Sequence, residues 1–474
     1  AGTLQAQNAG ADAYNVAVGY NAGNDITTGI KNTIIGGLAG GALTTSSENV
    51  VIGYGALAAE DTRGKVVAIG YRALNQQAAD ADTYNVAIGN QAGYSVTTGV
   101  RNTLIGGLAG DALTTGGYNV AIGYLALSAE DGNGRNVAIG NNTLMTQNAG
   151  SEAYNVAIGF AAGEAVTTGT QNTLIGGLAG DALQGGERNV AIGTYALSSE
   201  DGDGYNVAVG HSALLNQNAG ATAYNVAVGY SAGSQVTTGV QNTIIGGASG
   251  DALTTGAYNT SLGYNALTAE DTGTRNTAIG WSALENLNFD GSGQNTAVGF
   301  NAGAAINTGV KNTILGSECG DAITTGENNI VIGFNAAASA VGVDNEITLG
   351  DANISAFRCA DQSIAALSDG RDKSDVVESP YGLEFINKLK PVKFTWDFRP
   401  EHMSDVKQGK SRVGFIAQDL QEAMPNNDND ILDLVYEISE DRLEAKYGNL
   451  IPVMAKAIQE LSAEVKELKK QING

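Results

Sequence analysis

Asn85-Val86-Ala87-Ile88-Gly89 is the stretch that decides the fold of this 474-residue chain, because variants of it recur along three quarters of the sequence. Its glycine returns 20 times, first as Gly19, Gly36, Gly53, Gly70 and Gly89, and last as Gly350. The step from Gly70 to Gly89 is slightly longer than the three before it, and this set of four steps then repeats without slippage. A period of about 17 residues is too short for a helix pair or a propeller blade, and it suits one coil of a β-solenoid.

The order of residues inside the phrase predicts a short strand. Asn stands four residues before the glycine in 18 of the 20 copies, the next residue is always β-branched, and the residue before the glycine is Val, Ile or Leu. Two bulky residues flanking a smaller or apolar one give the period of two that is typical of a strand. Turn clusters such as Thr97-Thr98-Gly99 separate the phrases. We therefore predict a parallel β-solenoid of about 20 coils, which at roughly 4.8 Å per coil is a rod on the order of 95 Å long.

Composition and charge limit what such a rod can do. Aromatic residues make up only 6% of the chain and Gly accounts for 66 residues, so each coil buries little apolar surface. We expect parallel chains to associate along the rod and supply the missing burial. Residues 1–367 carry 29 acidic and 10 basic residues, within a net charge of −24 for the chain. An acidic rod argues against nucleic acid or an anionic membrane as a partner.

The chain divides into three parts. Residues 1–354 hold the repeats, residues 355–367 form a connector, and residues 368–474 form a small α+β domain, where all five prolines lie. Within that domain the patterns predict helices over 381–389 and 418–423 and strands over 392–396 and 413–416. The tail predicts a coiled-coil helix, although its pattern leaves the number of chains open. Its heptad positions are Ile451, Met454, Ile458, Leu461, Val465, Leu468 and Ile472.

Acidic pairs recur once in each set of four coils, but they give weak signals for chemistry. Adjacent carboxylates on a strand point apart, which is unsuited to sugar cleavage, and the pattern of a calcium loop is incomplete. We interpret the pairs as solvated turns. The two histidines and two cysteines lie in no metal spacing, Cys319 stands where other coils carry Ala, and no apolar run could span a membrane. We expect no cofactor and no metal. The residues concerned are Glu60-Asp61, Glu130-Asp131, Glu200-Asp201, Glu270-Asp271, His211, His402 and Cys359.

The stretch from Ser368 to Lys373 offers candidate chemistry. By spacing alone, Ser368-Asp369 is best interpreted as the cap of a helix. The alternative is a nucleophile with its base, because a serine needs a base to be activated and Ser–Lys pairs can do this. Lys373 would have to lose its proton, which burial or a nearby positive charge such as that of Arg371 would favour.

From Ser368 onward the chain resembles the endosialidase-type intramolecular chaperone found at the C-termini of phage tail fibres and tailspikes. Asp372 stands where that family usually has an apolar residue, commonly Leu. Separately, the repeats resemble the β-roll heads of trimeric autotransporter adhesins. The residues that carry the first resemblance are Ser368-Asp369-x-Arg371-x-Lys373, Gly382-Leu383-Glu384-x-Ile386-x-x-Leu389-Lys390-Pro391-Val392-x-Phe394-x-Trp396, Gly414-Phe415-Ile416-Ala417-Gln418, Pro425, Tyr447-x-x-Leu450-Ile451-Pro452 and Ala457-Ile458-x-Glu460-Leu461.

The resemblance implies a domain that helps three chains assemble and then cuts itself off before Ser368. Ser368 would be the nucleophile and Lys373 the base, in a single self-cleavage with no other catalysis. We expect a homotrimeric tail fibre in the phage virion, made in the host cytoplasm. Its partners would be a host receptor or polysaccharide and other tail proteins, without nucleic acid or membrane insertion. A bacterial surface adhesin and a polysaccharide depolymerase are the alternatives. Because the chain starts at Ala1 without Met, we also expect an N-terminal attachment segment before it.

Overall fold

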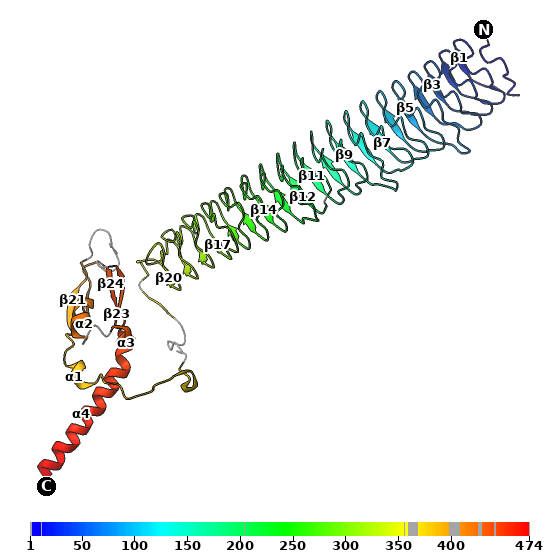
Figure 1. Cartoon of the computed structure of the whole chain (residues 1–474). Coiled ribbons are helices and arrows are strands. Elements are labelled where there is room, and N and C mark those ends of the chain that lie inside the picture. The colour runs from blue at the N-terminus through cyan, green and yellow to red at the C-terminus, as the bar shows by residue number, and fades with distance from the viewer. Residues whose placement is uncertain are drawn as a thin grey trace. The chain divides into compact units, whose positions relative to one another are not determined.

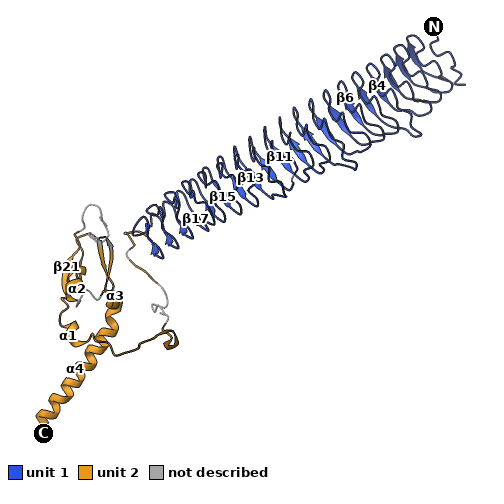
Figure 2. Cartoon of the chain, viewed as in Figure 1, with its two compact units in different colours: residues 1–349 blue, residues 350–474 orange. Residues whose placement is uncertain are grey.

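A computed structural model gives the structure of the chain, and it describes all residues except 1, 11, 203, 355, 359–367, 398–407, 425–428, 440–441 and 474. The chain forms two compact units, residues 1–349 and residues 350–474 (Figure 2). Most of the expected connector, residues 355–367, therefore lies outside the described residues.

The first unit is the predicted parallel β-solenoid (Figure 1). Its described residues contain 20 strands of three residues each, and each strand pairs in parallel with the next one along the chain, as Val86 in β5 does with Thr103 in β6. The strands are β1 Val16–Val18, β2 Thr33–Ile35, β3 Val50–Ile52, β4 Val67–Ile69, β5 Val86–Ile88, β6 Thr103–Ile105, β7 Val120–Ile122, β8 Val137–Ile139, β9 Val156–Ile158, β10 Thr173–Ile175, β11 Val190–Ile192, β12 Val207–Val209, β13 Val226–Val228, β14 Thr243–Ile245, β15 Thr260–Leu262, β16 Thr277–Ile279, β17 Thr296–Val298, β18 Thr313–Leu315, β19 Ile330–Ile332 and β20 Ile347–Leu349.

The recurring asparagine joins neighbouring coils from inside. The side-chain oxygen of Asn85 accepts the backbone N–H of Asn102 at 2.8 Å, and its amide nitrogen donates to the carbonyl of Gly99 at 2.8 Å. Asn102 repeats both bonds one coil later, with Asn119 and Gly116. Buried polar groups need such partners, so one side chain that satisfies two backbone groups explains why this position is so constant.

The recurring glycine is required because coils come too close there for a side chain. Gly123 has φ +139°, and a Cβ atom on it would lie 2.3 Å from the carbonyl oxygen of Gly140 in the next coil. Both the positive φ and the contact exclude other residues.

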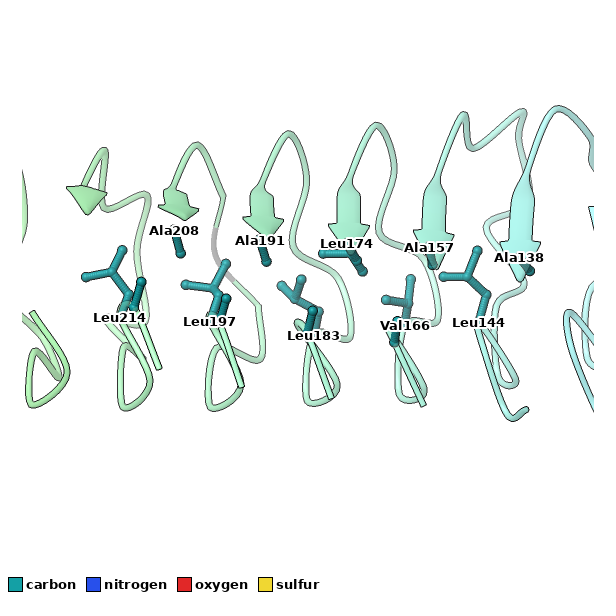
Figure 3. Packing of buried hydrophobic residues seen from close by; sticks show 14 of the residues in the cluster. Ala138, Leu144, Ala157, Val166, Leu174, Leu183, Ala191, Leu197, Ala208 and Leu214 are labelled. Carbon is teal, nitrogen blue, oxygen red and sulfur yellow. The ribbon is translucent and has the colours of Figure 1, made fainter. Parts of the chain in front are cut away.

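The core of the rod consists of rows of small and medium apolar side chains (Figure 3). The middle residue of a strand, such as Ala157 or Leu174, points inward and meets a second row that includes Leu144, Val166 and Leu183. Cys319 continues the alanine row and is fully buried, as its position in place of the usual Ala predicts.

The second unit contains short helices and two antiparallel strand pairs, β21–β22 and β23–β24. Its buried core is formed mainly by Phe385, Leu420, Leu434, Leu450 and Val453. The elements are the 3₁₀ helix η1 Gly370–Asp372, α1 Leu383–Ile386, β21 Val392–Thr395, β22 Ser411–Gly414, α2 Ala417–Ala423, α3 Asn429–Leu432, β23 Val435–Ser439, β24 Arg442–Ala445, the 3₁₀ helix η4 Tyr447–Asn449 and α4 Leu450–Asn473. A mostly β rod followed by a small α+β region that ends in a long helix was predicted, and this fold class is confirmed.

Candidate functional site

The candidate site is a single tight turn at the start of the sequence region that carries the chaperone resemblance. Asp369 caps η1, because its side-chain oxygen accepts the backbone N–H of Arg371 at 2.9 Å. The capping interpretation of this stretch therefore describes Asp369 correctly. After the turn the chain continues in an extended conformation at Lys373, with φ −124° and ψ 135°.

The turn brings Ser368 and Lys373 together. The side-chain nitrogen of Lys373 donates a hydrogen bond to the Ser368 hydroxyl oxygen at 2.5 Å. The two atoms are close enough for a proton to pass between them, and for catalysis the serine hydroxyl would have to donate and the lysine amine accept. Both side chains are exposed in the single chain. Leu367, on the other side of the expected cleavage point, lies outside the described residues.

The charges around the pair are arranged differently from the sequence-based expectation. Arg371 forms an ion pair with Asp369, with 2.5 Å between a guanidinium nitrogen and a carboxylate oxygen. These hydrogen bonds lower the pKa of Asp369 below its ordinary value. The positive charge of Arg371 is thus balanced locally by the carboxylate of Asp369. Asp372 is exposed.

The long helix α4 holds the chain that follows the turn. Glu460 accepts the backbone N–H of Leu383 at 2.7 Å, which caps α1 from 77 residues away. Gly382 is needed for this contact, because a Cβ atom there would lie 2.3 Å from the Glu460 carboxylate. Lys456 pairs with Glu378 at 3.0 Å. Gly382 and Glu460 both belong to the motifs that carry the family resemblance, and their close contact explains why these two residue types occur together.

A second set of residues from the family motifs joins the end of β22 to η4, the short helix before α4. The hydroxyl of Tyr447 donates to the carbonyl of Phe415 and accepts its backbone N–H, both at 3.2 Å. A Cβ atom on Gly414 would lie 2.8 Å from that hydroxyl oxygen. The sequence motifs contain Gly414, Phe415 and Tyr447 but do not reveal their role, because Phe415 and Tyr447 lie 32 residues apart along the chain.

Comparison with known families identifies this region. Residues 368–429 match the family described as chaperone of endosialidase. The chain carries an endosialidase-type chaperone domain after a long β-solenoid. This family implies autoproteolytic chaperone activity in the assembly of trimeric fibres, and it is typical of phage tail fibres and tailspikes. The match begins at Ser368, the first residue of the candidate pair. No curated protein matches the chain.

The second unit also leaves apolar surface uncovered. The α4 positions predicted as a heptad seam face outward, while Leu450, Val453 and Ala457 form its buried side. Beside the seam lies an apolar groove of about 390 Å³ whose lining includes Leu389, Phe415 and Met454. The exposed fractions of the seam residues are 64% for Ile451, 43% for Met454, 64% for Ile458, 48% for Leu461, 40% for Val465, 55% for Leu468 and 80% for Ile472.

The acidic pairs of the rod differ from the prediction of solvated turns. Asp131 is exposed, but Glu130 is fully buried, and its carboxylate accepts the backbone N–H of Asn133 at 3.0 Å. Burial raises the pKa of Glu130 above its ordinary value. The equivalent residues Glu60, Glu200 and Glu270 are also fully buried. The prediction was wrong for the glutamates, because only the coil geometry places this position inside.

Two further findings concern the described residues only. They contain no group of three or more His, Cys, Asp and Glu residues placed to hold a metal ion. No helix in them is both long enough and apolar enough to cross a membrane. Cys359 and His402 lie outside the described residues.

Proposed function

We propose that this chain is a subunit of a homotrimeric phage tail fibre that attaches the virion to a receptor or polysaccharide on the host surface. Residues 368–474 assemble three chains and then cleave themselves off before Ser368, using Ser368 as nucleophile and Lys373 as base. The observation that carries the proposal is the 2.5 Å hydrogen bond between these two side chains, at the first residue of the matched family.

Cleavage begins with a proton transfer. The neutral amine of Lys373 takes the proton of the Ser368 hydroxyl, and the oxygen attacks the carbonyl carbon of Leu367. The new C–O bond forms an ester as the bond from Leu367 carbon to Ser368 nitrogen breaks. The proton held by Lys373 passes to the leaving nitrogen. Water then hydrolyses the ester, which gives a carboxylate on Leu367 and restores the hydroxyl of Ser368.

Assembly would make this chemistry possible at the right time. A lysine exposed to water stays protonated at neutral pH and cannot accept a proton. Partner chains that cover the turn would remove water and favour the neutral amine. The exposed seam of α4 and the apolar groove beside it offer surface through which partners can be recruited. We therefore expect cleavage to follow trimerisation.

A binding role for the rod is better supported than a polysaccharide-cleaving one. Glycosidases need two carboxylates that face each other across the substrate. In three of the four repeated pairs, as in Glu130-Asp131, the glutamate is buried inside the rod and the aspartate is exposed, while Asp271 beside the buried Glu270 is partly buried. A host capsule incubated with the purified fibre should therefore be bound without becoming shorter. Shortened chains would favour the depolymerase.

The dyad is tested by expressing the full chain and measuring intact masses under denaturing conditions. The wild type should give two pieces, residues 1–367 and residues 368–474. Ser368→Ala should stay intact and still form trimers in light scattering. Ser374→Ala, an exposed serine just after the dyad, should cleave like the wild type. Cleavage at the same bond in Ser368→Ala would rule out this nucleophile.

The protonation of Lys373 gives a second test. Lys373→Arg should not cleave, because a guanidinium keeps its proton. Cleavage of the wild type should slow as the pH falls, because the amine becomes charged. Asp372→Leu should cleave faster, since a nearby carboxylate favours the protonated amine. Equal rates for Asp372→Leu and wild type at all pH values would show that Asp372 has no influence on the base.

A further inference from the structure

The turn that carries Ser368 and Lys373 does not pack into the core of the second unit. Every residue from 368 to 380 is exposed. The first buried side chain after the turn is that of Tyr381, whose ring meets the ring of Phe385 edge to face with 5.8 Å between their centres. The place that the dyad occupies is therefore set by the way in which the chain enters the core behind it.

Helix α4 holds this entry point through one tight joint. The Glu460 carboxylate accepts the backbone N–H of Leu383 at 2.7 Å. A Cβ atom on Gly382 would lie 2.3 Å from one oxygen of that carboxylate and 2.7 Å from the other, so the carboxylate fills the space that a side chain would need. Lys456, one turn earlier on α4, pairs with Glu378 at 3.0 Å and lies 3.8 Å from Glu460. The helix therefore contacts the entering chain at two points.

The need for a helix cap is a poor explanation for this joint. Helix α1 has only four residues, and a helix of about one turn has little stability of its own for a cap to protect. The acceptor is a charged group, which makes the hydrogen bond stronger than one between neutral groups. The joint also reaches beyond the family match, which ends at residue 429, whereas Glu460 follows it. A strong contact at this point fixes the place and the direction in which the chain leaves α4.

Self-cleavage depends on such placement. Catalysis requires the reacting atoms to be held in a defined geometry, and a misplacement of about 1 Å can slow a reaction by about a hundredfold. From Leu383 back to Lys373, an extended chain reaches up to roughly 33 Å, so its direction at the joint decides where within that range the dyad lies. Helix α4 also carries the exposed seam. The joint thus connects the surface offered to partner chains with the dyad.

We propose that Glu460 is a positioning residue for self-cleavage, which acts through the backbone of Leu383 and takes no part in the chemistry. While the joint is closed, the turn is presented at a fixed place relative to α4. Gly382 belongs to the same joint, because only a residue without a side chain leaves room for the carboxylate. The inference rests on the proposed dyad of Ser368 and Lys373 and adds a residue that controls how the dyad is placed.

The full chain, made by cell-free synthesis, allows cleavage to be timed on denaturing gels while trimers are measured by size-exclusion chromatography. Glu460→Ala should still form trimers but cleave at least about tenfold more slowly, as expected for the loss of a hydrogen bond to a charged group. Glu460→Gln keeps an oxygen that can accept the N–H of Leu383, and it should cleave at close to the wild-type rate. Glu464→Ala, at an exposed position one turn later on α4, is the matched control and should also cleave like the wild type.

Gly382→Ala tests the joint from its other side. Its Cβ atom would displace the Glu460 carboxylate, so cleavage should slow by about the same factor as in Glu460→Ala. The double variant Gly382→Ala/Glu460→Ala should cleave no more slowly than Glu460→Ala, because the carboxylate that the Cβ atom would meet is gone. Two unrelated losses of stability would add instead, and additive effects would therefore contradict the joint.

Three further outcomes would overturn the inference and leave the dyad standing. Trimers of Glu460→Ala that cleave at the wild-type rate would show that the contact is not needed. Loss of trimers together with cleavage in Glu460→Ala would show that Glu460 acts on folding. Slow cleavage in Glu460→Gln would show that its charge matters and not its contact with Leu383. A wild-type chain that stays intact, or Ser368→Ala that cleaves at the same bond, would instead remove the proposed dyad itself.

Discussion

The rod and the second unit differ in how far apart along the chain their contacting residues lie. In the rod, a residue contacts its counterpart in the next coil, as Asn102 does with Asn85. In the second unit, which contains the chaperone match, Tyr447 forms hydrogen bonds with Phe415 from 32 residues away, and Glu460 accepts the backbone N–H of Leu383 from 77 residues away. The rod can therefore grow coil by coil, whereas the chaperone domain closes only when nearly all of its sequence is present.

This difference means that the two regions face different problems in starting to fold. A coil gains its partners only from its neighbours, so the first coils to form have little to pack against. The chaperone domain has its own core around Phe385 and Leu434, and it presents an exposed helical seam that can bring chains together. We therefore expect the second unit, which can fold by itself and bring chains together, to help the rod begin folding.

The largest expected effect comes from removing the chaperone domain at the gene level. Residues 1–367 expressed alone should give little soluble rod, because nothing brings the chains together while the coils form. The uncleaved Ser368→Ala chain should give soluble trimers in normal amounts, since it keeps the domain. Yields are compared by size-exclusion chromatography with light scattering. A normal yield of trimeric rod from residues 1–367 would show that the rod needs no help.

Within the rod, two adjacent glycines allow the effect of close coil packing to be distinguished from the general effect of replacing a glycine. Gly176 has φ +138°, and a Cβ atom on it would lie 2.5 Å from the carbonyl oxygen of Gly193, whereas Gly177 has no atom within 4 Å of that position. Gly176→Ala should destabilise the rod by about 1–3 kcal/mol from strain, with the clash in addition. Gly177→Ala should change the free energy of unfolding by less than about 0.5 kcal/mol.

Thermal melting of the two variants measures this difference. Equal melting temperatures for Gly176→Ala and Gly177→Ala would mean that the coils can separate at the glycine row without cost. A lower melting temperature for Gly176→Ala alone would confirm that the stacking of coils depends on this row.

The rod was predictable from sequence because the residues that determine the structure of a coil lie within that coil and its neighbours. The phrase at Asn85 to Gly89 contains the strand, the inward residue and the glycine, and neighbouring coils supply the partners. The buried glutamates were missed, because a carboxylate in a turn-like stretch gives no local sign that it points inward. Glu130 does so because the coil encloses it and the N–H of Asn133 lies within reach.

The chaperone domain was predictable only in part, because long-range contacts set the ends of its elements. The strand predicted over 392–396 and the helix over 418–423 correspond closely to β21 and α2. The helix predicted over 381–389 is shorter in the structure, where Glu460 caps it at Leu383. The strands β23 and β24 lacked a clear alternation and were not predicted. Ser368 and Lys373 were found through the family motif, and their catalytic roles stay predictions.

The two regions should also respond to acid in opposite directions. Burial raises the pKa of Glu60, Glu130 and Glu270 in the rod. In the chaperone domain, hydrogen bonds from Arg371 and Lys390 lower the pKa values of Asp369 and Glu422. A raised pKa gives stability that is complete below the ordinary value and is lost as the pH rises through the folded-state value. A lowered pKa gives stability that is lost as the pH falls, and it contributes little here because both acids are exposed.

Glu130→Gln is the substitution that isolates this effect in the rod, and its effect should be the smallest of the three. The amide oxygen can still accept the N–H of Asn133, while the side chain no longer has to be buried as an anion. At neutral pH the variant should therefore be more stable than the wild type, by on the order of 1 kcal/mol. Below the ordinary pKa the wild-type glutamate is protonated and the difference should disappear. Asp131→Asn removes one charge from the exposed neighbour and serves as the control for the general repulsion within an acidic rod. Melting temperatures of the cleaved rod from about pH 4 to pH 8 decide the matter. If Glu130→Gln and Asp131→Asn follow the same curve, net charge sets the response to acid, and the buried carboxylates have no share in it.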